Sequence, residues 1–178
     1  MASTTRLRDR IFAAFGAFLF LGSACAVTAL YITSSNNNAN PQASQQTCSD
    51  TQTEEQLPVP EAYKPTEPVT SLQSTDLTVG SGQTAKNGDC LVMKYYGTLA
   101  SDGTKFDENF TDTTAFAFTL GQGQVITGWD QGLQGMKVGG TRRLVIPAAM
   151  AYGSQAQGTI PANSDLVFVV KLLRIKQP

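Results

Sequence analysis

The 178-residue sequence contains no histidine. This absence excludes Ser-His-Asp and Cys-His catalysis, together with every metal site that uses an imidazole ligand. Cysteine is scarce as well, because Cys25, Cys48 and Cys90 lie too far apart for a CxxC redox or zinc motif. Basic residues do not outnumber acidic ones, and the net charge of −1 provides no general attraction for nucleic acid. We therefore expect no cofactor, no metal and no nucleic-acid partner.

Charge is also absent from a long apolar stretch near the N-terminus, residues 11–32. As a helix this stretch would span roughly 33 Å at about 1.5 Å per residue, enough to cross a hydrocarbon core of about 30 Å. Arg6, Arg8 and Arg10 precede it, so the positive-inside rule leaves the N-terminus in the cytoplasm and the rest of the chain outside. We predict that residues 1–33 form a signal-anchor or transmembrane helix.

The fate of this segment has three interpretations. An uncleaved anchor is favoured, because the apolar run continues to Ile32. Ala24-Cys25-Ala26 also fits the cleavage site of a secretory signal peptide. Gly22-Ser23-Ala24-Cys25 resembles a bacterial lipoprotein box, with Cys25 as the lipidated residue. All three interpretations place the remaining chain outside the cytoplasm.

Residues 34–69 have little apolar content and are rich in Asn, Gln, Ser, Thr and Pro. Such a segment cannot bury enough apolar surface to offset the entropy of ordering it, so we predict a disordered spacer. Cys48 lies in this spacer, and outside the cytoplasm it could form a disulfide with Cys90. The favoured interpretation is that Cys90 is a small buried apolar residue.

Residues 70–178 read as one folded domain, because short apolar runs alternate there with glycine-containing turns. Trp129, Leu133 and Met136 recur at a spacing that places them on one face of a short helix. Strands are predicted at residues 91–96, 116–120, 141–147 and 166–175. The predicted fold is α+β: a twisted antiparallel β-sheet wrapped against one short α-helix.

The order of short motifs in this domain carries a family resemblance. The motifs are Tyr95-Tyr96-Gly97-Thr98-Leu99, Asp102-Gly103-Thr104-Lys105-Phe106-Asp107, Phe116-Ala117-Phe118-Thr119-Leu120-Gly121, Gln124-Val125-Ile126-Thr127-Gly128-Trp129, Ala151-Tyr152-Gly153 and Ile160-Pro161. In this order they resemble the FKBP-type peptidyl-prolyl isomerases over about residues 70–178. Lys94 departs from the family pattern, which frequently has histidine before the tyrosine.

The resemblance implies a role for each residue of an apolar proline pocket. Trp129 would form its floor, and Tyr152 would offer its hydroxyl to a substrate carbonyl. Asp107 would lie at the rim, and the Ile126 backbone N–H would bind a second carbonyl. The catalytic set is therefore Asp107, Tyr152, Trp129, Phe106 and Phe168, and the substrate-binding set is Tyr95, Phe116, Val125, Ile126 and Ile160. Phe118 and Leu133 are expected in the core.

The implied function is that of a membrane-tethered, monomeric peptidyl-prolyl cis-trans isomerase. Its expected partners are proline-containing unfolded or exported polypeptides, and macrolides of the tacrolimus type are expected ligands. A non-catalytic module that binds proline segments is the alternative, and a surface adhesin on a borrowed fold is a third. Asn109-Phe110-Thr111 is a glycosylation sequon if the host is a eukaryote.

Overall fold

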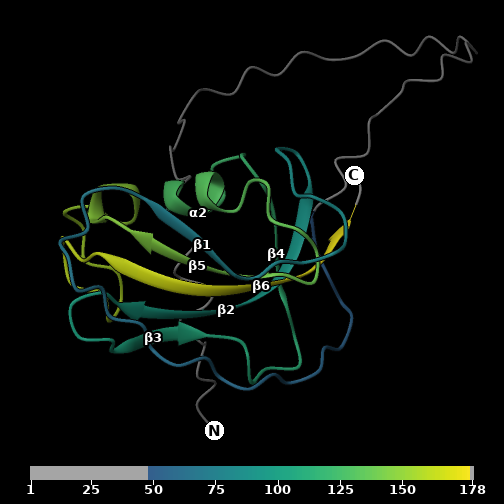
Figure 1. The fold of residues 1–178 in the computed structure, drawn as a ribbon, viewed down its shortest axis with the longest axis horizontal. Coiled ribbons are helices and arrows are strands. Elements are labelled where there is room, and N and C mark those ends of the chain that lie inside the picture. Colours follow the sequence, from purple (N-terminus) through teal and green to yellow (C-terminus); the bar gives the residue numbers. More distant parts are fainter. Residues whose placement is uncertain (1–47, 177–178) are drawn as a thin grey trace, which may run out of the picture.

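In the computed structural model, which describes residues 48–176, six antiparallel strands form one sheet and a short helix packs against it (Figure 1). The elements are β1 (Gln73–Thr78), β2 (Cys90–Leu99), β3 (Lys105–Glu108), β4 (Phe116–Thr119), α2 (Thr127–Gly132), β5 (Thr141–Ile146), the 3-10 helix η1 (Ala148–Met150) and β6 (Leu166–Lys176). The prediction of an antiparallel sheet with one short helix is confirmed. Within the described range no helix is long and apolar enough to cross a membrane. The predicted anchor, residues 1–33, and residues 34–47 lie outside that range.

The sheet has the strand order β1-β5-β6-β2-β3, and β4 also pairs with β2. Cys90 to Met93 of β2 pair with β4, whereas Tyr96 to Thr98 pair with β3. Both short strands therefore lie along the edge of β2 that β6 does not occupy. The chain between β3 and β4, residues 109–115, passes from one end of this edge to the other.

Three elements differ from the sequence prediction. The helix α2 ends at Gly132, so Leu133 is its C-cap, and Met136 follows a turn in which Gly135 has a φ of 74°. The prediction that one helix carries Trp129, Leu133 and Met136 was wrong, although all three side chains are buried. The strand β2 continues past Gly97 to Leu99. The strand β1 was not predicted because all its residues are exposed and show no apolar alternation.

Hydrogen bonds and charge attach β1 to the sheet. Arg142 donates from Nε and Nη2 to the two carboxylate oxygens of Asp76, at 2.7 and 3.0 Å. The hydrogen bond from Arg142 holds the pKa of the Asp76 carboxyl below its usual value. The same guanidinium donates from Nη1 to the carbonyl oxygens of Gly132 and Gln134, where α2 ends. One arginine thus joins the edge strand, β5 and the end of the helix.

The main core lies between the sheet and α2. Its fully buried side chains include Leu91, Met93, Leu144 and Ile146, with Trp129 contributed by the helix. The helix approaches β5 closely because two of its positions are glycine. A Cβ atom at Gly128 would lie 2.4 Å from Cγ2 of Ile146, and one at Gly132 would lie 2.8 Å from Cδ2 of Leu144.

The opposite face of the sheet is covered by residues 48–69, which we call the strap. Its side chains Tyr63 and Val69 pack against Ala100, Val145 and Val167. The Tyr63 ring also lies over the guanidinium of Arg143, 3.5 Å from its Cζ. The structure therefore differs from the predicted disordered spacer over residues 48–69. The strap has no regular secondary structure, but its few apolar side chains pack on the folded domain and its backbone forms hydrogen bonds with it.

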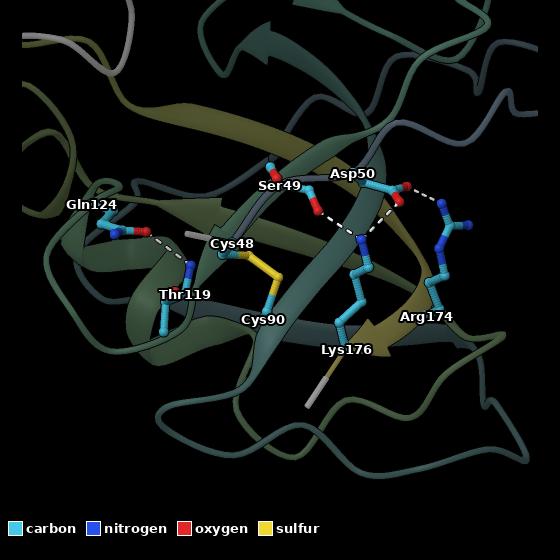
Figure 2. The surroundings of a disulfide bond; sticks show 8 residues. All are labelled: Cys48, Ser49, Asp50, Cys90, Thr119, Gln124, Arg174 and Lys176. Carbon is cyan, nitrogen blue, oxygen red and sulfur yellow. Dashed lines mark hydrogen bonds and ion pairs between the residues drawn. A yellow bond between two sulfur atoms is a disulfide. The ribbon is translucent and has the colours of Figure 1, made fainter. Parts of the chain in front are cut away.

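The N-terminal end of the strap is fixed at three points (Figure 2). Cys48 forms a disulfide with Cys90, the first residue of β2. Asp50, whose side chain is 1% exposed, pairs with Arg174 and Lys176 at the end of β6. Lys176 also donates to the carbonyl oxygen of Ser49. Cys90 is buried as expected, but the favoured interpretation without a disulfide was wrong, because a sequence separation of 42 residues gave no sign that Cys48 lies beside it.

The disulfide generates a stability prediction. In a Cys25→Ser background, which prevents a replacement pairing, Cys48→Ser should lower the free energy of unfolding by about 3–4 kcal/mol. The physical reason is that the cross-link limits the conformational entropy of the unfolded chain, and the effect grows with the enclosed loop. Urea unfolding followed by Trp129 fluorescence measures the change. Reduction of the background protein should reproduce it, and an unchanged unfolding midpoint in both cases would contradict the prediction.

Candidate active site

Aromatic side chains gather around Trp129 on the helix side of the sheet. The ring centroid of Trp129 lies 5.1 Å from that of Phe168, 5.5 Å from Tyr95 and 6.0 Å from Phe116, all in edge-to-face geometry. Phe106 extends the group through Phe168, with centroids 5.5 Å apart. We call these five residues the aromatic cluster. Its edge-to-face contacts fix each ring relative to its neighbours, so the cluster is a rigid apolar surface.

Gly97 makes room for two of these rings. A Cβ atom at this position would lie 2.7 Å from Phe106 and 2.8 Å from Phe168. Such distances are shorter than any ordinary carbon contact, so a larger residue would displace both rings. The two rings therefore require glycine at position 97, which lies inside β2 and not in a turn.

Some residues of the candidate site are fully buried, whereas others are partly exposed to solvent. Trp129, Tyr95 and Phe168 have exposed fractions of 0%, 1% and 2%. Phe116, Val125, Ile126 and Tyr152 are partly buried and pack against the same core, and Ile160 is buried within it. The cluster therefore has a floor that water does not reach and a partly exposed rim.

The segment before α2 is shaped by one carboxylate. Asp130 accepts hydrogen bonds from the N–H groups of Gly121 and Gly123, at 2.8 and 2.9 Å. These two bonds hold the turn that precedes Val125 and Ile126. Ile126 is the N-cap of α2, and among residues 48–176 no acceptor is bonded to its N–H. Its N–H can therefore donate to a carbonyl oxygen of a bound peptide.

Asp107 provides the polar group beside the cluster. The Tyr95 hydroxyl donates to Oδ2 of Asp107 at 2.6 Å, and the Glu108 N–H donates to Oδ1 at 2.9 Å. The partly buried carboxylate therefore keeps a fixed orientation. Burial and the nearby charge of Asp107 together raise the pKa of Tyr152. Tyr152 consequently keeps its proton at any physiological pH, so its hydroxyl is a hydrogen-bond donor.

The structure brings the ten predicted site residues together. Five belong to the aromatic cluster: Tyr95, Phe106, Phe116, Trp129 and Phe168. Val125, Ile126, Tyr152 and Ile160 pack against its core, and Asp107 is bonded to Tyr95. Phe118 and Leu133 are buried, as expected for core residues. In the described part of the chain no group of His, Cys, Asp or Glu side chains is arranged to hold a metal ion.

Asn109 has a structural role that the sequence did not reveal. Its side chain is fully buried, with Oδ1 accepting from the Tyr95 N–H at 2.6 Å and Nδ2 donating to the Met93 carbonyl at 3.3 Å. The amide thus continues the pairing of β2 beyond the end of β3. A glycan on Asn109 is incompatible with this fold, although the sequence Asn109-Phe110-Thr111 matches a sequon.

The sequence and the fold have clear relatives. The family model for FKBP-type peptidyl-prolyl cis-trans isomerases matches residues 81–173. "FK506-binding protein 4" of Neurospora crassa is 52% identical over 119 residues, which are 65% of this chain and 25% of that protein. "Peptidyl-prolyl cis-trans isomerase" of Saccharomyces cerevisiae is 54% identical over 101 residues, which are 57% of this chain and 24% of that protein. The chain thus spans about a quarter of the length of these relatives.

Two solved structures show the same similarity. The crystal structure of AtFKBP13 has a TM-score of 0.55 and 33% identity, and the match covers 59% of this chain and 93% of that one. The crystal structure of FkpA from Escherichia coli has a TM-score of 0.55 and 41% identity, with 62% of this chain and 50% of that one covered. With the family model matching more than half of the sequence, this chain belongs to the FKBP-type peptidyl-prolyl cis-trans isomerase family.

Proposed function

We propose that this protein is a peptidyl-prolyl cis-trans isomerase. The observation that carries the proposal is the aromatic cluster around Trp129, with the Asp107–Tyr95 hydrogen bond at its side. Membership of the family supports the same reaction. The proposed substrates are proline-containing unfolded or exported polypeptides, bound by a monomer.

Isomerisation of an X-Pro bond suits a site of this chemical character. The uncatalysed reaction takes tens to hundreds of seconds, because amide resonance creates a barrier of about 18–20 kcal/mol. The planar amide is more dipolar than the twisted one, so an apolar site raises the ground state relative to the twisted state. Each tenfold acceleration requires only about 1.4 kcal/mol, and no nucleophile is needed.

The proposed role of each apolar residue follows from how far its side chain is exposed to solvent. Trp129, Phe106 and Phe168 form the catalytic floor and wall that exclude water from the twisting bond. The partly exposed Phe116 and Val125, together with Tyr95 and Ile160, enclose the proline ring in this proposal. The cluster thus supplies shape and low polarity, and the polar groups around it act on the peptide backbone.

Three polar groups complete the proposed site. The Ile126 N–H and the Tyr152 hydroxyl donate to substrate carbonyl oxygens, which anchors the peptide on both sides of the twisting bond. Asp107, held by Tyr95 and by its neighbour's N–H, faces the amide as it loses planarity. Donors that are already oriented favour the twisted state without further reorganisation.

We also propose that the domain acts outside the cytoplasm, tethered by residues 1–33. The uncharged stretch at residues 11–32, preceded by three arginines, supports the tether. The Cys48–Cys90 disulfide supports an oxidising compartment. Cleavage within this segment or lipidation of Cys25 would give the same location by another route.

The isomerase proposal predicts a measurable rate. The purified full-length protein should accelerate cis/trans isomerisation of an X-Pro test peptide, and tacrolimus should block the acceleration. Relatives named FK506-binding proteins motivate the choice of this macrolide. NMR exchange spectroscopy of the peptide measures the rate. Peptide or macrolide binding without acceleration would replace the proposal by that of a non-catalytic proline-binding module.

The proposed role of Tyr152 predicts a selective loss. Tyr152→Phe removes one hydrogen-bond donor and retains the ring, so kcat/KM should fall about 2- to 10-fold with the fold intact. Tyr96→Phe is the matched control. Tyr96 lies on β2, opposite Val169 of β6 and Glu108 of β3, and is not part of the aromatic cluster. Equal activities of the two variants would remove the Tyr152 hydroxyl from the mechanism.

The proposed location predicts export of a reporter. Alkaline phosphatase, which matures only outside the bacterial cytoplasm, should be active when fused to the C-terminus of the full chain. Deletion of residues 1–33 should abolish this activity. An inactive full-length fusion would contradict export, and the mass of the mature protein separates an uncleaved anchor from cleavage or lipidation.

A further inference from the structure

The loop between β3 and β4 lies between two sets of hydrogen-bond donors. The six backbone carbonyl oxygens of residues 109–114, which we call the 109–114 loop, each accept a hydrogen bond. Lys94 Nζ donates to the carbonyl oxygens of Asn109, Asp112 and Thr114, at 3.1, 2.5 and 3.4 Å. The strap supplies donors to the other three: Leu57 N to Phe110 O, Gln56 Nε2 to Thr111 O and Glu54 N to Thr113 O, at 2.8, 2.6 and 2.7 Å.

Lys94 is an unusual residue for its position. It lies in the middle of β2 with an exposed fraction of 0%. Its neighbours Met93 and Tyr95 point into the main core, so Lys94 points to the opposite face of the sheet. A buried ammonium group is strongly unfavourable unless it is hydrogen-bonded, and it has three N–H groups to donate. The three loop carbonyls stabilise the charge, and the charge in turn fixes the loop.

The fixed loop connects two parts of the candidate site. Asp107 precedes it by two residues, and Phe116 follows it by two. At its first residue, Asn109 is bonded through its side chain to the backbone of Tyr95 and Met93, on either side of Lys94. The position of the loop therefore sets where the Asp107 carboxylate meets the Tyr95 hydroxyl and how Phe116 lies against Trp129.

We propose that Lys94 is a positioning residue for the isomerase reaction, acting through the 109–114 loop together with Gln56 of the strap. The proposal rests on the proposed isomerase function. Lys94 holds the inner side of the loop and the strap holds its outer side, so the strap is part of the active unit. A displacement of a reacting group by about 1 Å can reduce a rate about 100-fold, so small loop movements matter.

The test compares three variants of the full-length protein. Lys94→Met keeps a similar side-chain volume and removes all three donors. Gln56→Leu removes one donor on the strap side, at an exposed position. Lys171→Met is the matched control, because Lys171 is the cross-strand partner of Lys94 and donates instead to the Gly139 carbonyl, away from the loop. The kcat and KM values for an X-Pro peptide are measured well below each unfolding midpoint, and amide NMR spectra are recorded without substrate.

We expect kcat to fall about 10- to 100-fold in Lys94→Met with a smaller change in KM. Gln56→Leu should show a smaller fall in the same direction, and Lys171→Met should show none. A purely structural role would lower the unfolding midpoint and leave kcat of the folded protein unchanged, which would overturn the proposal. Where Lys94→Met does not fold, a wild-type kcat in Gln56→Leu overturns it.

The NMR spectra separate this inference from the proposed function. Even in a protein without isomerase activity, Lys94→Met should shift the amide signals of Asp107 and Phe116, and Lys171→Met should not. Unchanged signals at both residues would overturn the positioning role of Lys94. A wild-type protein that does not accelerate isomerisation overturns the proposed function instead.

Discussion

The antiparallel pairing of β2 with β6 is the constraint on which the rest of the structure depends. All ten residues of β2 have a partner on β6, from Cys90 opposite Lys176 to Leu99 opposite Leu166, with one shift of register between Val92 and Met93. Because side chains alternate along a strand, successive residues of β2 serve opposite faces of the sheet. Tyr95 enters the aromatic cluster on one face, and Lys94 meets the 109–114 loop on the other. A shift of this register by one residue would exchange the two faces and remove both features together.

The two faces are closed by different means. The helix α2 covers one face with Trp129 and approaches closely through Gly128 and Gly132. The other face is covered by the strap, whose contacts are a few apolar side chains, backbone hydrogen bonds and ion pairs. A sheet with two apolar faces needs both covers, so the folded unit begins well before β1.

The sequence was sufficient for the fold class and for the proximity of the ten residues proposed for the site. The site could be predicted because its aromatic residues occur in short motifs. A family resemblance is recognised from the order of such motifs along the chain. The strap could not be predicted, because polar and proline-rich residues have the same composition whether they are solvated or pack on a neighbour. Neither the Cys48–Cys90 disulfide nor the buried Lys94 has a local signal, since each depends on residues that the fold brings near from elsewhere in the chain. The extent of α2 was overestimated because buried side chains in a turn can repeat with helical spacing.

The anchoring of the strap also has a consequence for the order in which the domain completes its fold. Asp50, near the beginning of the described chain, pairs with Arg174 and Lys176, near its end (Figure 2). The ribosome adds Arg174 long after Asp50, because 124 residues separate the two in the sequence. During synthesis the strap emerges before all six strands, and its ion pairs with β6 cannot form until that strand has left the exit tunnel. The N-terminal end of the strap therefore gains its ion pairs only after β6 is available, so this part of the back face closes late in folding.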